Sequence, residues 1–446
     1  MRYYFNFYPN AYAYFYFRIK HDHTLIRMST KLALVLSIAI CIFCGCKSEK
    51  KSEISKRQET SFINKVEFSG GPASSLPVLF SNSENAILSW VTMLDDSTSQ
   101  LNYAYLQEDK WSTPNEIITD KGWFVNWADF PSITENNGTL LAHFLKKTSP
   151  ATFSYDINLS LKPKGKSEWV IQNKLHTDGT KTEHGFVTAL PYKDDSFFVT
   201  WLDGRETAGG SNHHHSGHGG DMTIRSATVS SSGAVTDRTL LDNKTCSCCQ
   251  TTAAITRNGP VVLYRDRTDQ EIRDIAITRL VNGKWTTPKP IHNDGWEING
   301  CPVNGPKASA IGNSLAVAWY TGANERPSVK IVFSQNGGED FSTPVEVSGP
   351  NPLGRVDVEL IDPENAIVSW MEKTGSSTYI KAAKVNIEGK RSPSVTISKL
   401  DGSRKTGFPQ MCLFDNKLYF AWTALENNSS TIASAYLELD SFSILQ

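Results

Sequence analysis

Short apolar runs recur along the chain after residue 60, and polar turn residues separate them. The seven runs are NAILSWV (85–91), GTLLAHFL (138–145), SFFVTWL (196–202), GPVVLYR (259–265), NSLAVAWY (313–320), ENAIVSWM (364–371) and NKLYFAW (416–422). Each carries an aromatic residue near its end, and these aromatics follow one another at intervals of 51 to 63 residues. Alternating patterns rich in β-branched residues predict strands rather than helices. Each run is therefore expected to be one strand of a repeated unit.

Each unit contains further segments with strand-like patterns. In the fourth unit QTTAAITRN, GPVVLYR, EIRDIAITRL and KWTTPKPIH follow as inner, second, third and outer strand. Such a period predicts one all-β, seven-bladed β-propeller over residues 62–446. The segment 62–70 is expected to supply the outer strand of the last blade and to close the ring. Two packed β-sandwiches are the alternative, but they do not account for the regular spacing.

The residues before the propeller resemble targeting segments. Lys31 and an apolar run from Leu32 to Gly45 suit a signal peptide over 28–45, within an N-terminal part (1–45) whose first residues form a doubtful extension. Gly45 before Cys46 resembles a bacterial lipobox, so we expect lipidation of Cys46; an uncleaved anchor is the alternative. Residues 46–61 lack apolar content and are expected to be a tether. The expected location is the bacterial outer membrane, facing the periplasm or the outside.

Charge excludes one class of partner. The chain has 45 Lys and Arg against 46 Asp and Glu, a formal net charge of −1. Residues 1–45 hold five basic and one acidic residue, so 40 basic and 45 acidic residues remain after the expected cleavage. Nucleic acid is not an expected partner, because nucleic-acid modules usually carry a basic excess. An anion-binding site would have to be local.

Propeller geometry predicts where such a site would lie. Loops from second to third strands and links from outer strands to the next blade share one face, and they carry most of the unusual residues. Ligand sites usually form where such loops converge. The arginines in or beside these loops are Arg205, Arg265, Arg267, Arg273, Arg355 and Arg404. Converging guanidinium groups bind carboxylate, sulfate or phosphate. Pairing with nearby acidic residues is the alternative.

A family resemblance sharpens this expectation. The segment FSQNGGEDF (333–341) resembles an Asp box, with Asn336 at the usual Asp position. The segments WLDGR, CSCCQ, YRDR, EIRD, NGCPVNGP, GRVDV and GFPQM, between about residues 120 and 412, resemble a group of bacterial sialidase-like lipoproteins. Sialidases use an arginine triad, a tyrosine nucleophile paired with glutamate, and an acidic proton donor.

The resemblance implies roles for particular residues. Tyr264 would be the nucleophile, Glu183 its base and Asp129 the proton donor. The anion would be held by Arg205, Arg273 and Arg355. Two features depart from sialidases: the segment SLPVLF has no arginine where they carry a Phe-Arg-Ile-Pro motif, and seven units replace six blades. A six-bladed, sialidase-type propeller is therefore the alternative fold, and Tyr264 at a repeated aromatic position would equally suit packing.

Three further polar residues fit roles at a ligand site. His184 beside Glu183 would form an acid–base pair or a hydrogen-bonded rim histidine. Asn304 and Gln410 would bind ligand hydroxyls or cap the loops through backbone hydrogen bonds.

Cysteine and histidine cluster in neighbouring loops. Thiolate, imidazole and thioether ligands suit copper, and thiolate with imidazole suits zinc. The candidate ligands are His213, His214, His215, His218, Cys246, Cys248 and Cys249. A disulfide from Cys301 to the cysteine cluster is the alternative, since the export route is oxidising.

Three functions follow from these observations. The first is a lipid-anchored propeller that binds, and in a hydrolytic version cleaves, an acidic carbohydrate or a related small anionic ligand. The second is a copper- or zinc-binding envelope lipoprotein that uses the Cys and His loops. The third is a non-catalytic scaffold that binds envelope proteins.

Overall fold

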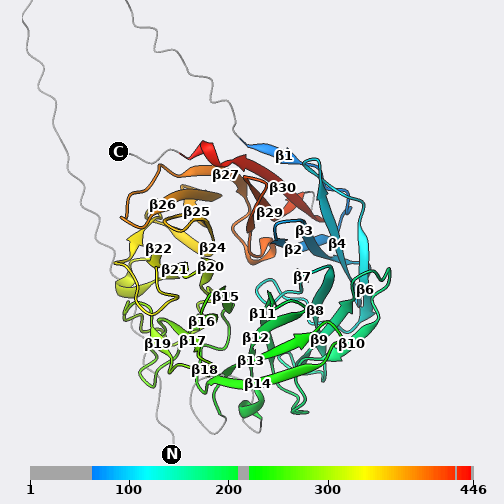
Figure 1. The fold of residues 1–446 in the computed structure, drawn as a ribbon. Helices are drawn as coiled ribbons and strands as arrows, with labels where there is room; N and C mark the ends of the chain where they lie inside the picture. Colours follow the sequence, from blue (N-terminus) through cyan, green and yellow to red (C-terminus); the bar gives the residue numbers. More distant parts are fainter. Residues whose placement is uncertain (1–62, 209–219, 427–428, 443–446) are drawn as a thin grey trace, which may run out of the picture. The chain divides into compact units, whose positions relative to one another are not determined.

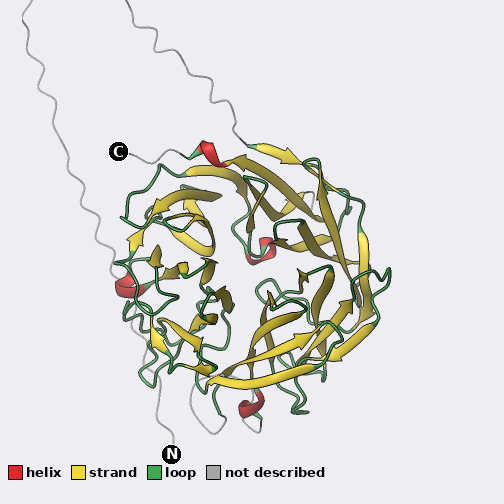
Figure 2. Ribbon diagram, viewed as in Figure 1, coloured by secondary structure: helices red, strands yellow, loops and turns green. Residues whose placement is uncertain are grey.

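A ring of seven antiparallel sheets makes up the protein (Figure 1). The structure is a computed structural model, and it describes residues 63–208, 220–426 and 429–442. Every sheet begins with a strand near the centre and continues outward in chain order, except that the last sheet takes β1 as its outer strand. The predicted seven-bladed propeller is confirmed. Figure 2 shows strands as the dominant element, with short helical turns only in the loops.

The strands fall into four positions within a blade. The inner strands are β2 (Ser74–Ser81), β7 (Ser132–Asn136), β11 (His184–Tyr192), β15 (Thr252–Thr256), β20 (Lys307–Ile311), β24 (Pro352–Asp362) and β28 (Gln410–Phe414). The second strands are β3 (Ala86–Met93), β8 (Thr139–Lys147), β12 (Ser196–Asp203), β16 (Gly259–Arg265), β21 (Ser314–Thr321), β25 (Asn365–Thr374) and β29 (Lys417–Glu426). The third strands are β4 (Thr98–Gln107), β9 (Tyr155–Lys162), β13 (Thr223–Ser230), β17 (Ile275–Val281), β22 (Ser328–Ser334), β26 (Ser377–Asn386) and β30 (Ser429–Glu438).

The outer position is less regular. It is occupied by β5 (Lys110–Trp111) with β6 (Asn115–Lys121), β10 (Ile171–Lys174), β14 (Val235–Asp242), β18 (Lys284–Trp285) with β19 (Lys289–Pro290), β23 (Val345–Glu346), β27 (Val395–Leu400) and β1 (Asn64–Val66). The short 3-10 helices are η1 (Arg205–Thr207), η2 (Ala323–Glu325), η3 (Arg404–Thr406) and η4 (Leu439–Ser441).

The ring closes through the two ends of the described chain. Strand β1 pairs antiparallel with β30, with Val66 opposite Ser434. Val66 is buried and packs in one apolar cluster with Trp90 and Tyr419. The expectation that the segment 62–70 completes the last blade is therefore confirmed. Closure removes an exposed sheet edge, which is otherwise a site of aggregation.

The repeated aromatic residues form the core between blades. The ring positions are Trp90, Phe144, Trp201, Tyr264, Trp319, Trp370 and Trp422, and all are buried. Several direct their polar atom to an acidic side chain: the indole N–H of Trp201 donates to Asp203 and that of Trp370 donates to Glu372, both at 2.8 Å. The sequence repeat is therefore a packing repeat.

The expected signal segment, the lipidated Cys46 and the tether all lie outside the described residues. Within the part of the chain that is described, no helix has the length and apolar character needed to cross a membrane.

Candidate functional site

Contacts between two kinds of loop confirm the predicted loop face. Gly204, after β12, donates its amide at 2.8 Å to the carbonyl of Glu183, in the link between β10 and β11. Thr245, in the link between β14 and β15, donates in the same way to Met222, in the loop before β13. Links and second-to-third-strand loops therefore lie together on one side of the blades.

Two predicted carboxyl groups meet at a tyrosine on this face. The hydroxyl of Tyr155, the first residue of β9, lies 2.9 Å from Asp129 Oδ2 and 2.8 Å from Glu183 Oε1. Tyr155 and Asp129 are buried, and Glu183 is half-buried. Phe124 stacks on Tyr155 with ring centroids 4.0 Å apart. Sequence reasoning missed Tyr155, although it pairs as a bridge with Glu183 and its position just after a second-to-third-strand loop was a usable signal.

The environment keeps protons on this group near neutral pH. Burial raises the pKa of Asp129 to about 7, against the hydrogen bonds from the Phe186 amide and from Tyr155. Burial also raises the pKa of Glu183 to about 8, and the neighbouring Asp129 adds to the increase. Burial and the two acids raise the pKa of Tyr155 well above its ordinary value. The Tyr155 hydroxyl has one proton and can donate it to only one of the two carboxyl groups at a time. Asp129, Glu183 and Tyr155 together can therefore both give and accept a proton near pH 7.

Tyr264 lies elsewhere. It is 1% exposed, and its hydroxyl donates to Asp242. The expected pair of Tyr264 and Glu183 is therefore not formed among the described residues, because the repeated position turns the ring into the core between blades. Tyr155 provides the hydroxyl that reaches Glu183.

His184 belongs to a separate buried cluster. Its ring stacks on His176 with centroids 3.7 Å apart, and its Nε2 lies 3.3 Å from Asp178 Oδ2. His176 Nδ1 lies 2.8 Å from the same oxygen. Burial lowers the pKa of His176, and the neighbouring His184 lowers it further. The structure places His184 with these groups instead of with the Glu183 carboxyl.

Three of the six predicted arginines are paired with acids. Arg205 makes a bidentate contact with Asp203, with two nitrogens each 2.7 Å from an oxygen. Arg267 and Arg273 share Glu271, at 2.6 and 2.7 Å. The pairing alternative thus describes these three side chains.

Arg265 has a different environment. It is 2% exposed, and its guanidinium donates to the carbonyls of Arg273, Asn304 and Tyr320 at 2.6 to 3.0 Å. It also lies over the Trp296 ring, 4.9 Å from the centroid. These contacts join the fourth and fifth blades, so the side chain holds backbone and is not open to a ligand.

The last two arginines converge on one indole. The guanidinium carbons of Arg355 and Arg404 lie 5.0 and 5.6 Å from the Trp127 ring centroid. Trp127 is half-exposed and stacks on Phe408 at 5.7 Å. Arg355 is buried and donates to Gly407 O and Thr406 Oγ1, whereas Arg404 is exposed. Within the described ranges, neither arginine has an ion pair with an acid.

Burial lowers the pKa of Arg355 to about 10, the charge of Arg404 contributes to the decrease, and the charge of Asp401 opposes it. Two positive charges therefore lie close together, with Asp401 near Arg355 but in no ion pair with it among the described residues.

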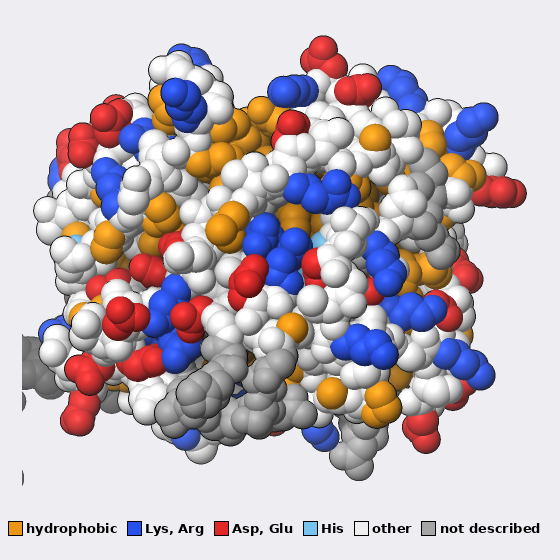
Figure 3. All heavy atoms as spheres, turned by 90° about the horizontal axis from the view of Figure 1, so that it is seen from below, with side chains coloured by type: hydrophobic (Ala, Val, Ile, Leu, Met, Phe, Trp, Pro, Cys, Tyr) orange, Lys and Arg blue, Asp and Glu red, His pale blue; other side chains and the backbone are white. Residues whose placement is uncertain are grey.

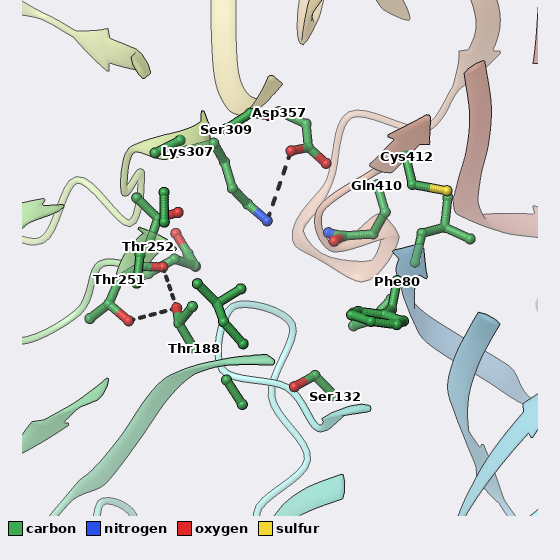
Figure 4. A pocket seen from close by; sticks show the side chains of 18 of the residues that line it. Phe80, Ser132, Thr188, Thr251, Thr252, Lys307, Ser309, Asp357, Gln410 and Cys412 are labelled. Atoms are coloured by element: carbon green, nitrogen blue, oxygen red, sulfur yellow. Dashed lines mark hydrogen bonds and ion pairs between the residues drawn. The ribbon is translucent and has the colours of Figure 1, made fainter. Parts of the chain in front are cut away.

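The two predicted amides mainly hold loops. Asn304 Oδ1 accepts the Arg355 amide at 2.7 Å, and its Nδ2 donates to Pro302 O. Gln410 Nε2 donates to Phe408 O at 3.0 Å. Figure 4 shows the Gln410 side chain directed into the axial cavity.

A polar cavity of about 460 Å³ lies between the inner strands. Its lining includes Ala128, Asp129, Phe130, Thr188, Thr251, Lys307, Asp357, Phe408 and Gln410. Lys307 points into it from β20, with Nζ 4.0 Å from Asp357 Oδ1 on the neighbouring β24 (Figure 4). Burial raises the pKa of Glu359, another lining residue, to about 8. Two lining residues connect the cavity to the groups described above. Asp129 also contacts Tyr155, and Phe408 also stacks on Trp127, so the cavity adjoins both the tyrosine–carboxyl group and the Trp127 ring.

The predicted cysteines lie together. Cys246 Sγ is 3.7 Å from Cys248 Sγ and 3.5 Å from Cys249 Sγ. Cys301, from the link between β19 and β20, contacts Cys248. All four are free thiols, so the alternative disulfide is not formed in this structure. The candidate ligands His213, His214, His215 and His218 lie outside the described residues.

Blue and red side chains alternate over the edge of the propeller (Figure 3). This side therefore shows mixed charge and no single continuous basic surface, in agreement with the near-zero net charge.

These features define the class: a closed seven-bladed β-propeller with a polar axial cavity and its chemically distinctive loops on one face. No protein-family model matches the sequence, and no curated protein matches it.

Solved structures of similar fold include a protein of unknown function from Dyadobacter fermentans, with 12% identity, a TM-score of 0.46, and 70% of this chain and 94% of that chain covered. An α-L-arabinofuranosidase mutant from Fusarium graminearum has 11% identity and a TM-score of 0.45, covering 85% and 99%. A Hadza microbial sialidase has 11% identity and a TM-score of 0.44, covering 77% and 74%. Such distant likenesses carry no argument about activity.

Proposed function

We propose that the protein binds an anionic glycan at the mouth of the axial cavity. One observation carries the proposal: Arg355 and Arg404 both lie over the partly exposed ring of Trp127, and neither forms an ion pair with an acid among the described residues. Trp127 would supply an aromatic platform, and Arg404 would hold the acidic group of the ligand. Ligand sites commonly combine aromatic walls with a few placed charged groups.

The electrostatics support this arrangement. The Arg355 guanidinium is committed to carbonyl and hydroxyl acceptors, so it acts on the ligand through its charge. Arg404 is exposed and its donors remain available. An anion placed beside both groups would relieve their mutual repulsion and would accept charge-assisted hydrogen bonds from Arg404.

Binding can be tested by calorimetry with sialylated, uronate-containing, sulfated and neutral oligosaccharides. We expect binding of acidic glycans only, weakened by salt. Arg404→Gln should reduce affinity about tenfold, or about 1.4 kcal/mol. Arg326→Gln is the matched control, because Arg326 is also exposed but pairs with Glu346 at 3.2 Å. Equal affinities of wild type and Arg404→Gln would overturn the proposed site.

A second activity, retaining hydrolysis, is favoured by the shared tyrosine. The Tyr155 hydroxyl lies 2.9 Å from Asp129 Oδ2 and 2.8 Å from Glu183 Oε1, so a candidate acid and a candidate base both adjoin one phenol. In this proposal Tyr155 attacks the anomeric carbon while its proton passes to Glu183, and Asp129 protonates the leaving oxygen.

Hydrolysis can be tested with a fluorogenic sialoside and by NMR of the first-formed anomer. We expect retention and a bell-shaped pH dependence with its maximum between about pH 7 and pH 8. Asp129, with a pKa of about 7, must carry a proton to act as the acid, and Glu183, with a pKa of about 8, must have lost its proton to act as the base. Tyr155→Phe should abolish turnover while leaving glycan binding in place. Turnover of that variant at the wild-type rate would exclude the nucleophile.

We also propose that Cys46 is lipidated and holds the propeller at the outer membrane. The apolar run ending at Gly45 and the polar residues after Cys46 support this. Metabolic palmitate labelling and membrane fractionation test it. Labelled wild type and unlabelled Cys46→Ser are expected, and unlabelled wild type would exclude the anchor.

A further inference from the structure

Four cysteine side chains gather at the junction of the third and fourth blades. Three of them, in the sequence CSCC, belong to the link between β14 and β15, and Cys301 comes from the next link. The sulfur atoms of Cys246, Cys248 and Cys249 all lie within 4.8 Å of one another. Cys301 contacts Cys248 but is not one of the group whose sulfurs all lie within 4.8 Å of one another.

The spacing of the sulfurs matches one geometry well. Ligands about 2.3 Å from a tetrahedral zinc ion lie about 3.8 Å from one another. The measured separations from Cys246 Sγ are 3.7 and 3.5 Å. A disulfide would instead bring two sulfurs to about 2.05 Å. These three thiols are thus arranged around a common centre and not as bonded pairs.

The surroundings suit a negatively charged thiolate centre. Arg273 Nη1 lies 3.3 Å from Cys246 Sγ, and this guanidinium is itself buried. Three cysteines alone would leave a tetrahedral centre one ligand short. Cys301, which contacts Cys248 and is exposed, is the candidate for the fourth ligand.

We propose that these four thiols bind one thiophilic d10 metal ion, Zn²⁺ or Cu⁺. On binding, each coordinating thiol releases its proton to solvent, so the affinity falls as the pH falls. The ion would tie the link after the third blade to the link after the fourth. The candidate histidines lie outside the described residues, so the proposal rests on the four thiols.

The test uses the full chain without a histidine tag, purified under reducing conditions. Metal content is measured by mass spectrometry after addition of Zn²⁺ or Cu⁺ and removal of excess ion. We expect one ion per chain, and Co²⁺ should give the charge-transfer and visible bands of a tetrahedral thiolate site. The preferred ion is identified by competition between the two.

Variants locate the site. Cys301→Ser, a change at an exposed side chain, should weaken metal binding and alter the cobalt spectrum, and Cys246→Ser should remove binding. Arg273→Gln should weaken it about 10-fold, as for other residues that support a metal ligand. The control is Cys412→Ala: Cys412 is the remaining cysteine among the described residues, is buried beside the axial cavity, and should not affect binding.

Two results would overturn the proposal. One is the same metal content in wild type and in folded Cys301→Ser and Cys246→Ser proteins. The other is peptide mapping that finds the four residues joined as disulfides in protein taken directly from the cell envelope. Circular dichroism confirms that each variant is folded, so loss of metal is not mistaken for loss of structure.

Discussion

Arg265 provides a sharp test of the difference between a structural and a ligand-binding arginine. Its loop position suggested a ligand site, but in the structure its guanidinium group donates hydrogen bonds to the carbonyls of Arg273, Asn304 and Tyr320. The change Arg265→Lys keeps the positive charge but replaces the planar guanidinium group with a single ammonium nitrogen. We expect it to destabilise the protein strongly, with no direct effect on a bound anion.

The magnitude follows from the contacts. Arg265 makes four hydrogen bonds to three carbonyl oxygens while 2% exposed. A lysine ammonium cannot reach all three acceptors from one nitrogen, so at least two hydrogen bonds are lost. At about 1.5–3 kcal/mol for each bond with a charged donor, the free energy of unfolding should fall by about 3–6 kcal/mol. That is a large part of the roughly 5–15 kcal/mol typical of a folded domain.

Urea unfolding followed by tryptophan fluorescence measures the change, since the chain has 11 tryptophans. Arg267→Lys is the matched control: it lies two residues away, is partly exposed and pairs with Glu271 and Asp221. Its loss should be below about 1 kcal/mol. A midpoint for Arg265→Lys equal to that of the control would refute the reasoning, and normal stability with lost glycan binding would restore the ligand role.

Three other changes test separate parts of the structure. Glu183 keeps its proton in the folded state up to a pKa of about 8 against an ordinary 4.5, so wild-type stability should fall as pH rises between these values, by at most about 1.4 kcal/mol per pH unit. Glu183→Gln should flatten that slope in melting temperatures; an unchanged slope would contradict the assignment. Val66→Asp places a charge in the buried closing strand, and we expect a lower melting temperature and faster proteolysis near the chain ends. Tyr264→Phe should leave glycan binding unchanged and lower stability by about 1–3 kcal/mol, because the hydrogen bond from the buried Tyr264 hydroxyl to Asp242 is lost; reduced binding at normal stability would count against the site.

The fold was largely predictable because a propeller repeats its packing. Trp90 and Trp370 recur for the same reason, to fill the space between neighbouring blades, and their spacing counts the blades. Closure by β1 followed from the lack of an outer strand after the last unit. Both inferences need only the order of strands along the chain.

The site was predictable in part. Loop position correctly placed Asp129 and Glu183 on one face, but it gave no means to choose between Tyr155 and Tyr264, which depends on the direction of each ring. Loop position also could not distinguish arginines that bind acidic side chains or carbonyls from arginines that remain exposed. Arg265 and Arg404 look alike in sequence, yet one is held by carbonyls contributed by a neighbouring blade and the other is exposed.

A comparison among blades shows why Asp129 is unusual. Asp129, Gln250 and Asn304 lie before the inner strands of three blades, and each accepts an amide hydrogen bond from the next blade, at 2.7, 3.1 and 2.7 Å. An uncharged amide performs this role at two of the three places. The fold therefore does not require an acid at the third, where burial opposes ionisation and raises the pKa to about 7.

Asp129→Asn separates the two roles of this residue. The variant keeps an oxygen to accept the Phe186 amide, so the connection between blades should persist and stability above pH 7 should be equal to or higher than that of wild type. It removes the proton that a leaving group would need, so turnover of a sialoside should be lost while glycan binding remains. Melting temperature, calorimetric binding and sialoside hydrolysis measured on the same preparation distinguish these effects. If the variant loses stability and binding together, Asp129 serves the fold, and the acid at this position has no chemical role.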